Sequence, residues 1–128
     1  MDIKYSTQAT AIGGRNGHVK TDDGLSQLTL ALPKELGGRG NATNPEQLFA
    51  AGYAACFANA LLHVAMAKKI NIGQPVVTAT VGIGPNQEGG FALDVELVVA
   101  LALPQVEAAA ITQAAHQVCP YSNATRGG

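Results

Sequence analysis

The stretch "NPEQLFAAGYAACFANALLHVAMA", residues 44–67, decides how this chain folds. Asn44 is a good N-cap, Pro45 suits the first helical position, and the Glu46 carboxylate favours the positive end of a helix. Thr43 with Glu46 would instead form a capping box, which moves the start by one residue. The stretch therefore predicts a long helix with two alternative starts.

This predicted helix carries no charged residue from position 47 to 67, so it is long enough to be tested as a membrane span. Alanine and glycine dominate it, and Asn59 and His63 interrupt it, which makes insertion into a bilayer weak. The pattern favours a helix that protein buries on nearly all sides, and no membrane partner.

The segments before this helix have the pattern of short strands separated by turns. Residues 3–11 are β-prone and lead into the turn "GGRNG". An extended piece at 18–21 precedes the turn "DDG", and leucines then alternate with other residues over 28–32. These segments predict a three-stranded antiparallel meander.

The segments after the helix predict a hairpin and a second helix. Apolar residues alternate over 77–83 and again over 91–103, on either side of the turn "PNQEGG". A second helix is expected after Pro104, with an apolar face made of Ala108, Ile111, Ala115 and Val118. It should end at Cys119, because Pro120 cannot continue it. The order β-β-β-α-β-β-α predicts an α+β fold, with residues 1–128 as a single domain.

The composition excludes some partners. The net charge of −1 and a pI near 6.2 predict no nucleic-acid partner. The first ten residues, "MDIKYSTQAT", contain no apolar run, so we expect a cytoplasmic protein with reduced thiols. Abundant alanine and glycine favour tight helix packing or a sizeable subunit interface.

The chain has two cysteines, Cys56 and Cys119, and each has an ordinary interpretation. Cys56 could be a small core hydrophobe, and a reactive thiol at mid-helix would need a cation from elsewhere in the fold. Cys119 is expected at a helix C-terminus, where the dipole disfavours a thiolate. Cys56 and His63 lie ~10 Å apart along the predicted helix, and no zinc spacing occurs, so no metal site is expected.

The roles of Arg15 and Glu46 stay open when the sequence alone is considered. Arg15 lies in the glycine-rich turn and could be a solvated turn residue. Glu46 is fully explained by its place in the first helical turn.

The motifs "TNPEQLFAAGYAACF" (43–57) and "CPYSNATRG" (119–127) closely resemble the organic hydroperoxide resistance (Ohr) subgroup of the OsmC-like family. The resemblance implies antiparallel sheets wrapped around long central helices in an intertwined homodimer. It also implies a peroxidatic Cys56, a resolving Cys119, and Arg15 with Glu46 organising the thiolate. Family members usually continue past the second motif with a further strand, so the resemblance predicts that one edge strand is missing.

The implied activity is a thiol peroxidase without a cofactor, which reduces organic hydroperoxides and is recycled by dihydrolipoyl groups. Glu46 and Cys56 are ten residues apart, which is ~15 Å along a helix, so an Arg15 that contacts both favours a site shared between two subunits. The alternative is a sharp break in the helix near Gly52. Two rival classes stay open: a dimeric carrier of organic ligands with inert cysteines, and a redox sensor without turnover.

Overall fold

The computed structural model describes residues 1–126 of the chain. It consists of two compact units, Met1–Leu48 and Phe49–Gly128, and each is described by itself. The prediction of a single domain stays a prediction. The expected absence of a C-terminal strand concerns positions outside the described residues.

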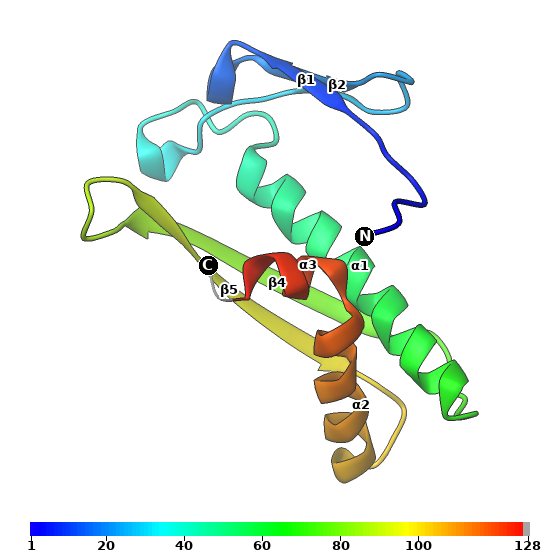
Figure 1. Cartoon of the computed structure of the whole chain (residues 1–128). Coiled ribbons are helices and arrows are strands. Elements are labelled where there is room, and N and C mark those ends of the chain that lie inside the picture. The colour runs from blue at the N-terminus through cyan, green and yellow to red at the C-terminus, as the bar shows by residue number, and fades with distance from the viewer. Residues whose placement is uncertain (127–128) are drawn as a thin grey trace. The chain divides into compact units, whose positions relative to one another are not determined.

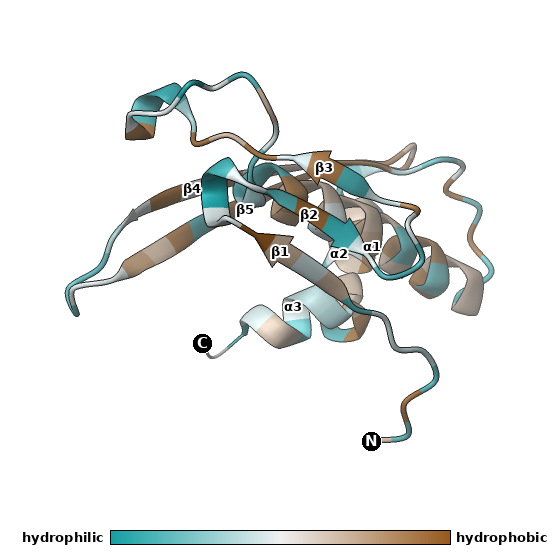
Figure 2. Ribbon diagram, turned by 90° about the horizontal axis from the view of Figure 1, so that it is seen from above, coloured by the Kyte–Doolittle hydropathy of each residue, from teal (hydrophilic) through white to brown (hydrophobic). Residues whose placement is uncertain are grey.

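The first unit contains the predicted meander. Strands β1 (Ala9–Ile12), β2 (His18–Thr21) and β3 (Gln27–Thr29) form an antiparallel sheet in that order (Figure 2). Strand β2 has its predicted bounds, whereas β1 and β3 are shorter than predicted, and β1 pairs only with the four residues of β2. Just after β3, Leu30 forms an isolated parallel bridge with Thr43.

Helix α1 (Pro45–Ala67) follows a short 3-10 turn, η2 (Lys34–Leu36). The backbone N–H of Gln47 donates to the Asn44 side-chain oxygen at 2.9 Å, so Asn44 is the N-cap. The Thr43 hydroxyl is 2.7 Å from the Gln47 side-chain oxygen, and the alternative start is therefore wrong.

The C-terminal end of α1 is closed by a left-handed residue. Lys69 has φ 57°, which is unusual for a residue other than glycine. The N–H of Ile70 donates to the Ala65 carbonyl at 2.9 Å, and the N–H of Lys69 donates to the Met66 carbonyl at 3.0 Å. These two bonds make a Schellman motif that satisfies the last free carbonyls of the helix.

The second unit is built on the predicted hairpin. Strands β4 (Val76–Pro85) and β5 (Phe91–Ala100) pair along their whole length, as the two long arms in Figure 1 show. Helices α2 (Gln105–Val118) and α3 (Pro120–Thr125) follow. Helix α3 was not predicted, since Pro120 was interpreted only as the end of α2. Pro120 is also the first residue of α3, a position that proline favours.

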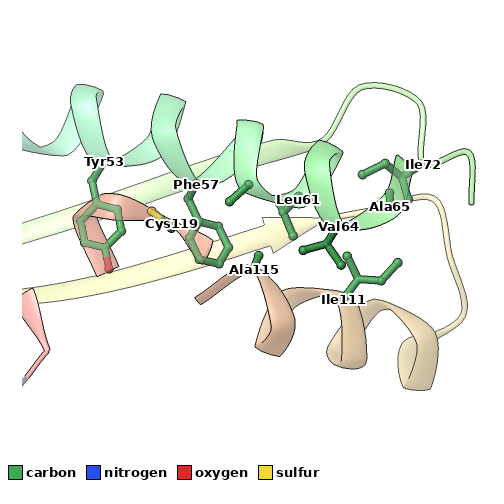
Figure 3. Packing of buried hydrophobic residues seen from close by; sticks show 10 residues of the cluster. Tyr53, Phe57, Leu61, Val64, Ala65, Ile72, Ile111, Ala115 and Cys119 are labelled. Carbon is green, nitrogen blue, oxygen red and sulfur yellow. The ribbon is translucent and has the colours of Figure 1, made fainter. Parts of the chain in front are cut away.

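The core of this unit lies between α1, α2 and one face of the hairpin. Phe57 and Leu61 point from α1 toward Ile111 and Ala115 of α2 (Figure 3). The inward residues of the hairpin pack against the same cluster; they are Val77, Val95, Leu97 and Val99. Val118, which was predicted to share the apolar face of α2, is exposed, and the next residue, Cys119, is buried instead.

Helix α1 is long and apolar enough to cross a membrane by length and composition alone. Such a helix is weak support for a membrane span, because the core helix of a soluble protein passes the same test. Six of the 23 residues of α1, from Tyr53 to Ala65, are buried, so this chain covers one face of the helix and not nearly all sides as predicted.

Candidate active site

The two cysteines meet although 63 residues separate them in sequence. The Cys56 sulfur on α1 lies 3.5 Å from the Cys119 sulfur at the junction of α2 and α3, and both thiols are free. A disulfide requires about 2.05 Å. The two sulfurs must therefore approach each other by about 1.5 Å for a disulfide to form.

Cys119 lies at two helix ends at once. It is the C-cap of α2 and the N-cap of α3. Burial raises the pKa of the Cys119 thiol, but hydrogen bonding from Ser122, from the thiol of Cys56 and from the backbone of Tyr121 outweighs burial, so the pKa is lowered overall. The sequence-based expectation that Cys119 would be a disfavoured thiolate is therefore wrong.

The pKa of the Cys56 thiol is raised, in contrast to that of Cys119. Burial raises the pKa of the Cys56 thiol, the neighbouring Cys119 raises it further, and only the backbone N–H of Tyr121 lowers it. Nothing cationic among these contributions favours the anion. The contacts of the second unit therefore favour the neutral thiol of Cys56, and a positive charge beside it would favour the thiolate.

Arg15 and Glu46 form a two-pronged ion pair in the first unit. Nη1 of Arg15 donates to one Glu46 carboxylate oxygen at 2.5 Å, and Nη2 donates to the other at 3.0 Å. The hydrogen bond to Glu46 raises the pKa of Arg15, so the guanidinium stays charged. A guanidinium has five N–H donors, so this pair leaves donors for a further anion. The Arg15 side chain is 37% exposed, against 14% for Glu46.

The loop that carries Arg15 is held rigidly by its backbone. Arg15 is the middle residue of the 3-10 turn η1 (Gly14–Asn16). A Cβ on Gly17 would lie 1.8 Å from the Ile12 carbonyl oxygen, so only glycine fits where the turn closes. The Asn16 side chain accepts the N–H of Leu32 at 3.0 Å, which ties the turn to the chain after β3.

The structure thus brings the four predicted site residues together as two pairs, one in each unit. Arg15 contacts Glu46, and Cys56 contacts Cys119. The open interpretation of Glu46 as a residue of the first helical turn alone is incomplete, because the carboxylate also binds the guanidinium. The catalytic roles of all four residues stay a prediction.

Sequence reasoning missed a buried polar group beside Cys119. The Ser122 hydroxyl lies 2.8 Å from the Tyr53 hydroxyl and 3.0 Å from Nδ1 of His116. The three residues come from α3, α1 and α2, and no local pattern connects them. The available signal was the order Cys-Pro-Tyr-Ser, which places a serine at the third position of a helix that proline starts.

A groove also opens on the second unit, and mostly apolar side chains line it, among them Phe49, Tyr53, Leu93 and Leu97. Neither cysteine lines this groove. Among residues 1–126, no group of three or more histidine, cysteine or acidic side chains could hold a metal ion. The candidate reactive groups described above are the two thiols of the second unit and the charged guanidinium of the first.

Comparison with known proteins identifies the family of the chain. Residues 38–128 match the OsmC-like protein family. The organic hydroperoxide resistance protein of Xanthomonas axonopodis pv. citri is 48% identical, over 98% of this chain and 89% of that protein. Crystal structures of organic hydroperoxide resistance proteins from Legionella pneumophila and Bacillus subtilis superpose with TM-scores of 0.95 and 0.88, at 55% and 43% identity. They cover 98% and 97% of this chain, which in turn covers 93% of each. The chain therefore belongs to the OsmC-like family, among the organic hydroperoxide resistance proteins.

Proposed function

We propose that this protein is a cysteine-based peroxidase that reduces organic hydroperoxides to alcohols. The 3.5 Å approach of two sulfurs from distant parts of the chain carries the proposal, since two inert core cysteines have no need to meet. The Cys56 thiolate attacks the outer peroxide oxygen, the O–O bond breaks, and the alkoxide leaves as an alcohol after it gains a proton. Cys56 becomes a sulfenic acid.

Cys119 then resolves the sulfenic acid. Its thiolate attacks the Cys56 sulfur, the S–O bond breaks, and hydroxide leaves and is protonated to water. The product is a disulfide between Cys56 and Cys119. A dithiol of the dihydrolipoyl class supplies the two electrons and two protons that restore both thiols. A cytoplasmic location is part of the proposal, because thiols persist in reducing compartments.

The cation that Cys56 lacks is Arg15, acting across a homodimer. The guanidinium keeps donors beyond those bound to Glu46, and its charge would lower the pKa of the Cys56 thiol. Ten residues of α1 separate Glu46 from Cys56, which is ~15 Å along a helix. In two α1 helices that cross antiparallel, the beginning of one lies beside the middle of the other. Each site then combines the Arg15–Glu46 pair of one subunit with the cysteine pair of its partner.

The surface of α1 supports this dimer. Leu62 and Met66 are 41% and 78% exposed, although the helix is apolar around its whole circumference. A helix of this kind is normally covered on all sides. The apolar surroundings of Cys56, which include Tyr53 and Phe57, also favour an alkyl or aromatic hydroperoxide over hydrogen peroxide.

Turnover of cumene hydroperoxide with dihydrolipoamide tests the proposed activity. Cys56→Ser should abolish peroxide consumption, whereas Cys119→Ser should react once and then stall or overoxidise. Mass spectrometry of the wild-type protein after one equivalent of peroxide should find the intramolecular disulfide. Sustained turnover with both cysteines unlinked would refute the resolving role. Binding of the hydroperoxide without consumption would favour the ligand carrier, and a single oxidation without turnover would favour the sensor.

Subunit mixing tests the shared site. Glu46→Ala and Cys56→Ser proteins should each be weak or inactive. When they are denatured and refolded together, mixed dimers should regain activity, because one of their two sites is fully wild-type. Mixed dimers that form, as differential tags show, and stay as inactive as the parents would place both residues in one chain.

A further inference from the structure

Cys119 is itself the hinge between helices α2 and α3. Its N–H donates to the Ala115 carbonyl at 2.9 Å, as part of α2, and its carbonyl accepts the N–H of Asn123 at 3.0 Å, as part of α3. Between these two bonds the backbone is extended, with φ −68° and ψ 119°, as a residue before proline prefers. The angle between the two helices is therefore set at the residue that carries the second thiol.

The bend removes the usual donors from two carbonyl groups at the end of α2. In a continuous helix the His116 carbonyl would accept the N–H of residue 120, but Pro120 has no N–H. The Gln117 carbonyl would accept the N–H of Tyr121, which lies beyond the bend in α3. Carbonyl groups at a helix end need other partners, which side chains or water provide.

The side chains of Asn123, in α3, and of Arg126, at its C-cap, supply these donors. Nη2 of Arg126 donates to the His116 carbonyl at 2.5 Å, and Nδ2 of Asn123 donates to the Gln117 carbonyl at 3.3 Å. Nη1 of Arg126 also donates to Oδ1 of Asn123 at 2.6 Å, so the two side chains are bound to each other. This pair, called the Arg126–Asn123 clamp below, joins the α3 segment to α2 across the hinge.

Helix α3 is also joined to α1, which carries the other cysteine. The Ser122 hydroxyl lies 2.8 Å from the hydroxyl of Tyr53, and Tyr53 precedes Cys56 by three residues, about one turn of the same helix. The clamp therefore connects α2, through α3, to the part of α1 that carries Cys56. A rotation at the hinge would move Cys119 relative to Cys56, whose sulfur lies 3.5 Å from its own.

We propose that Arg126 and Asn123 are positioning residues for Cys119: the clamp holds the hinge between α2 and α3 so that the Cys119 sulfur stays beside that of Cys56. A thiol that is held in place has a higher effective concentration at its partner, which favours the disulfide and speeds its formation. The effect on the resolving step rests on the proposed peroxidase function, whereas the effect on the disulfide equilibrium does not.

The first test uses no peroxide. The protein is equilibrated with mixtures of oxidised and reduced dithiothreitol, so that two electrons and two protons pass from the Cys56 and Cys119 thiols to the dithiothreitol disulfide. The intramolecular protein disulfide is quantified by mass spectrometry after free thiols are blocked with a maleimide. Arg126→Ala should lower the equilibrium constant for disulfide formation about fivefold, because two exposed hydrogen bonds from a charged group are lost.

Arg126→Lys should restore part of this loss, since an ammonium can still donate to the His116 carbonyl but cannot hold two acceptors with a planar fork. An unchanged equilibrium constant in Arg126→Ala would overturn the proposal. A wild-type protein that forms no disulfide between Cys56 and Cys119 in any of the mixtures would overturn it as well.

A double-mutant cycle tests whether the two side chains act as one unit. Asn123→Ala should also lower the equilibrium constant, and the double variant should lose less than the product of the two single effects, because the bond between Asn123 and Arg126 is lost in each. Single effects that multiply would overturn the clamp. Thr125→Val is the matched control, since the Thr125 hydroxyl donates to carbonyl groups within α3 and should leave the constant unchanged. An equal loss in Thr125→Val would indicate a general loosening of α3 and overturn the proposal.

The second test follows the proposed cycle after one equivalent of cumene hydroperoxide. Arg126→Ala should slow disulfide closure about fivefold and slow it more than peroxide consumption, so that more of the Cys56 sulfenic acid is trapped by dimedone. Equal slowing of both steps would overturn the role of the clamp in resolution. A wild-type protein that consumes no hydroperoxide would refute the peroxidase, and the dithiothreitol equilibrium would still decide whether the clamp positions Cys119.

Discussion

Gly52 on α1 is a position where helix propensity and packing oppose each other, and the balance can be measured. Alanine at an exposed helix position is more favourable than glycine by about 1 kcal/mol. A Cβ on Gly52 would, however, lie 2.8 Å from the Tyr121 hydroxyl oxygen and 3.3 Å from two carbons of the Tyr121 ring. The hydroxyl contact is too close to exist, whereas the ring contacts need only a small adjustment.

In Gly52→Ala the Tyr121 side chain must therefore move. The ring contacts Tyr53 and Phe49, with centroids 5.7 and 6.3 Å apart, and leaving such partners costs ~0.5–1.5 kcal/mol per aromatic pair. This cost offsets the gain in helix propensity, so we expect the free energy of unfolding to change little or to fall by about 1 kcal/mol. In a Tyr121→Phe background the obstructing oxygen is absent, and Gly52→Ala should stabilise the protein by about 1 kcal/mol.

The assay is urea unfolding of the four proteins of this double-mutant cycle, reduced and at one fixed protein concentration. The coupling between the two positions should be at least about 1 kcal/mol, well above the ~0.3–0.5 kcal/mol scatter of independent sites. Ala109→Gly on the exposed face of α2 is the control, and should cost about 1 kcal/mol in either background. The reasoning fails if Gly52→Ala has the same effect with tyrosine and with phenylalanine at position 121.

Substitutions at three further positions test other parts of the structure. Lys69→Gly should stabilise the protein by about 1 kcal/mol in urea unfolding, because glycine adopts the left-handed φ of 57° without steric cost; a loss of stability would contradict the Schellman geometry. Arg15→Ala should raise the pKa of Cys56 and reduce the peroxidase rate most near neutral pH. Arg15→Lys should restore little activity, because an ammonium lacks the planar fork that binds the Glu46 carboxylate. A pH–rate profile that neither variant changes would indicate that Arg15 is only a solvated turn residue. Burial lowers the pKa of His116 in the folded protein, so the free energy of unfolding should fall as the pH drops below ~6.5. His116→Gln should reduce this dependence of stability on pH. An equal dependence in both proteins would argue against a buried neutral ring.

The sequence predicted those elements whose signal is local. Apolar residues alternate over 77–83 and 91–103, and the strands β4 and β5 lie there, although β4 is longer and β5 ends three residues earlier. Asn44-Pro45 marks a helix start, which was predicted correctly. Helix α3 has six residues, too few for a periodic pattern, and it was missed. That omission also reversed the expected electrostatics of Cys119, because the N-terminal end of α3 was not considered. The contact of Ser122 with Tyr53 joins residues 69 positions apart, and only tertiary packing creates it.

The 3.5 Å separation of the two sulfurs also determines which molecules can compete for the oxidised protein. Groups held at reacting distance behave as if each were present at an effective molarity of up to ~10⁵ M or more. In the proposed cycle, a freely diffusing thiol at a far lower concentration loses the competition with Cys119 for the Cys56 sulfenic acid. In the proposed cycle the external reductant therefore meets a disulfide and not a sulfenic acid. Which reductants act on the protein is therefore decided by how each one binds beside the uncharged disulfide. That step comes after the peroxide has been reduced.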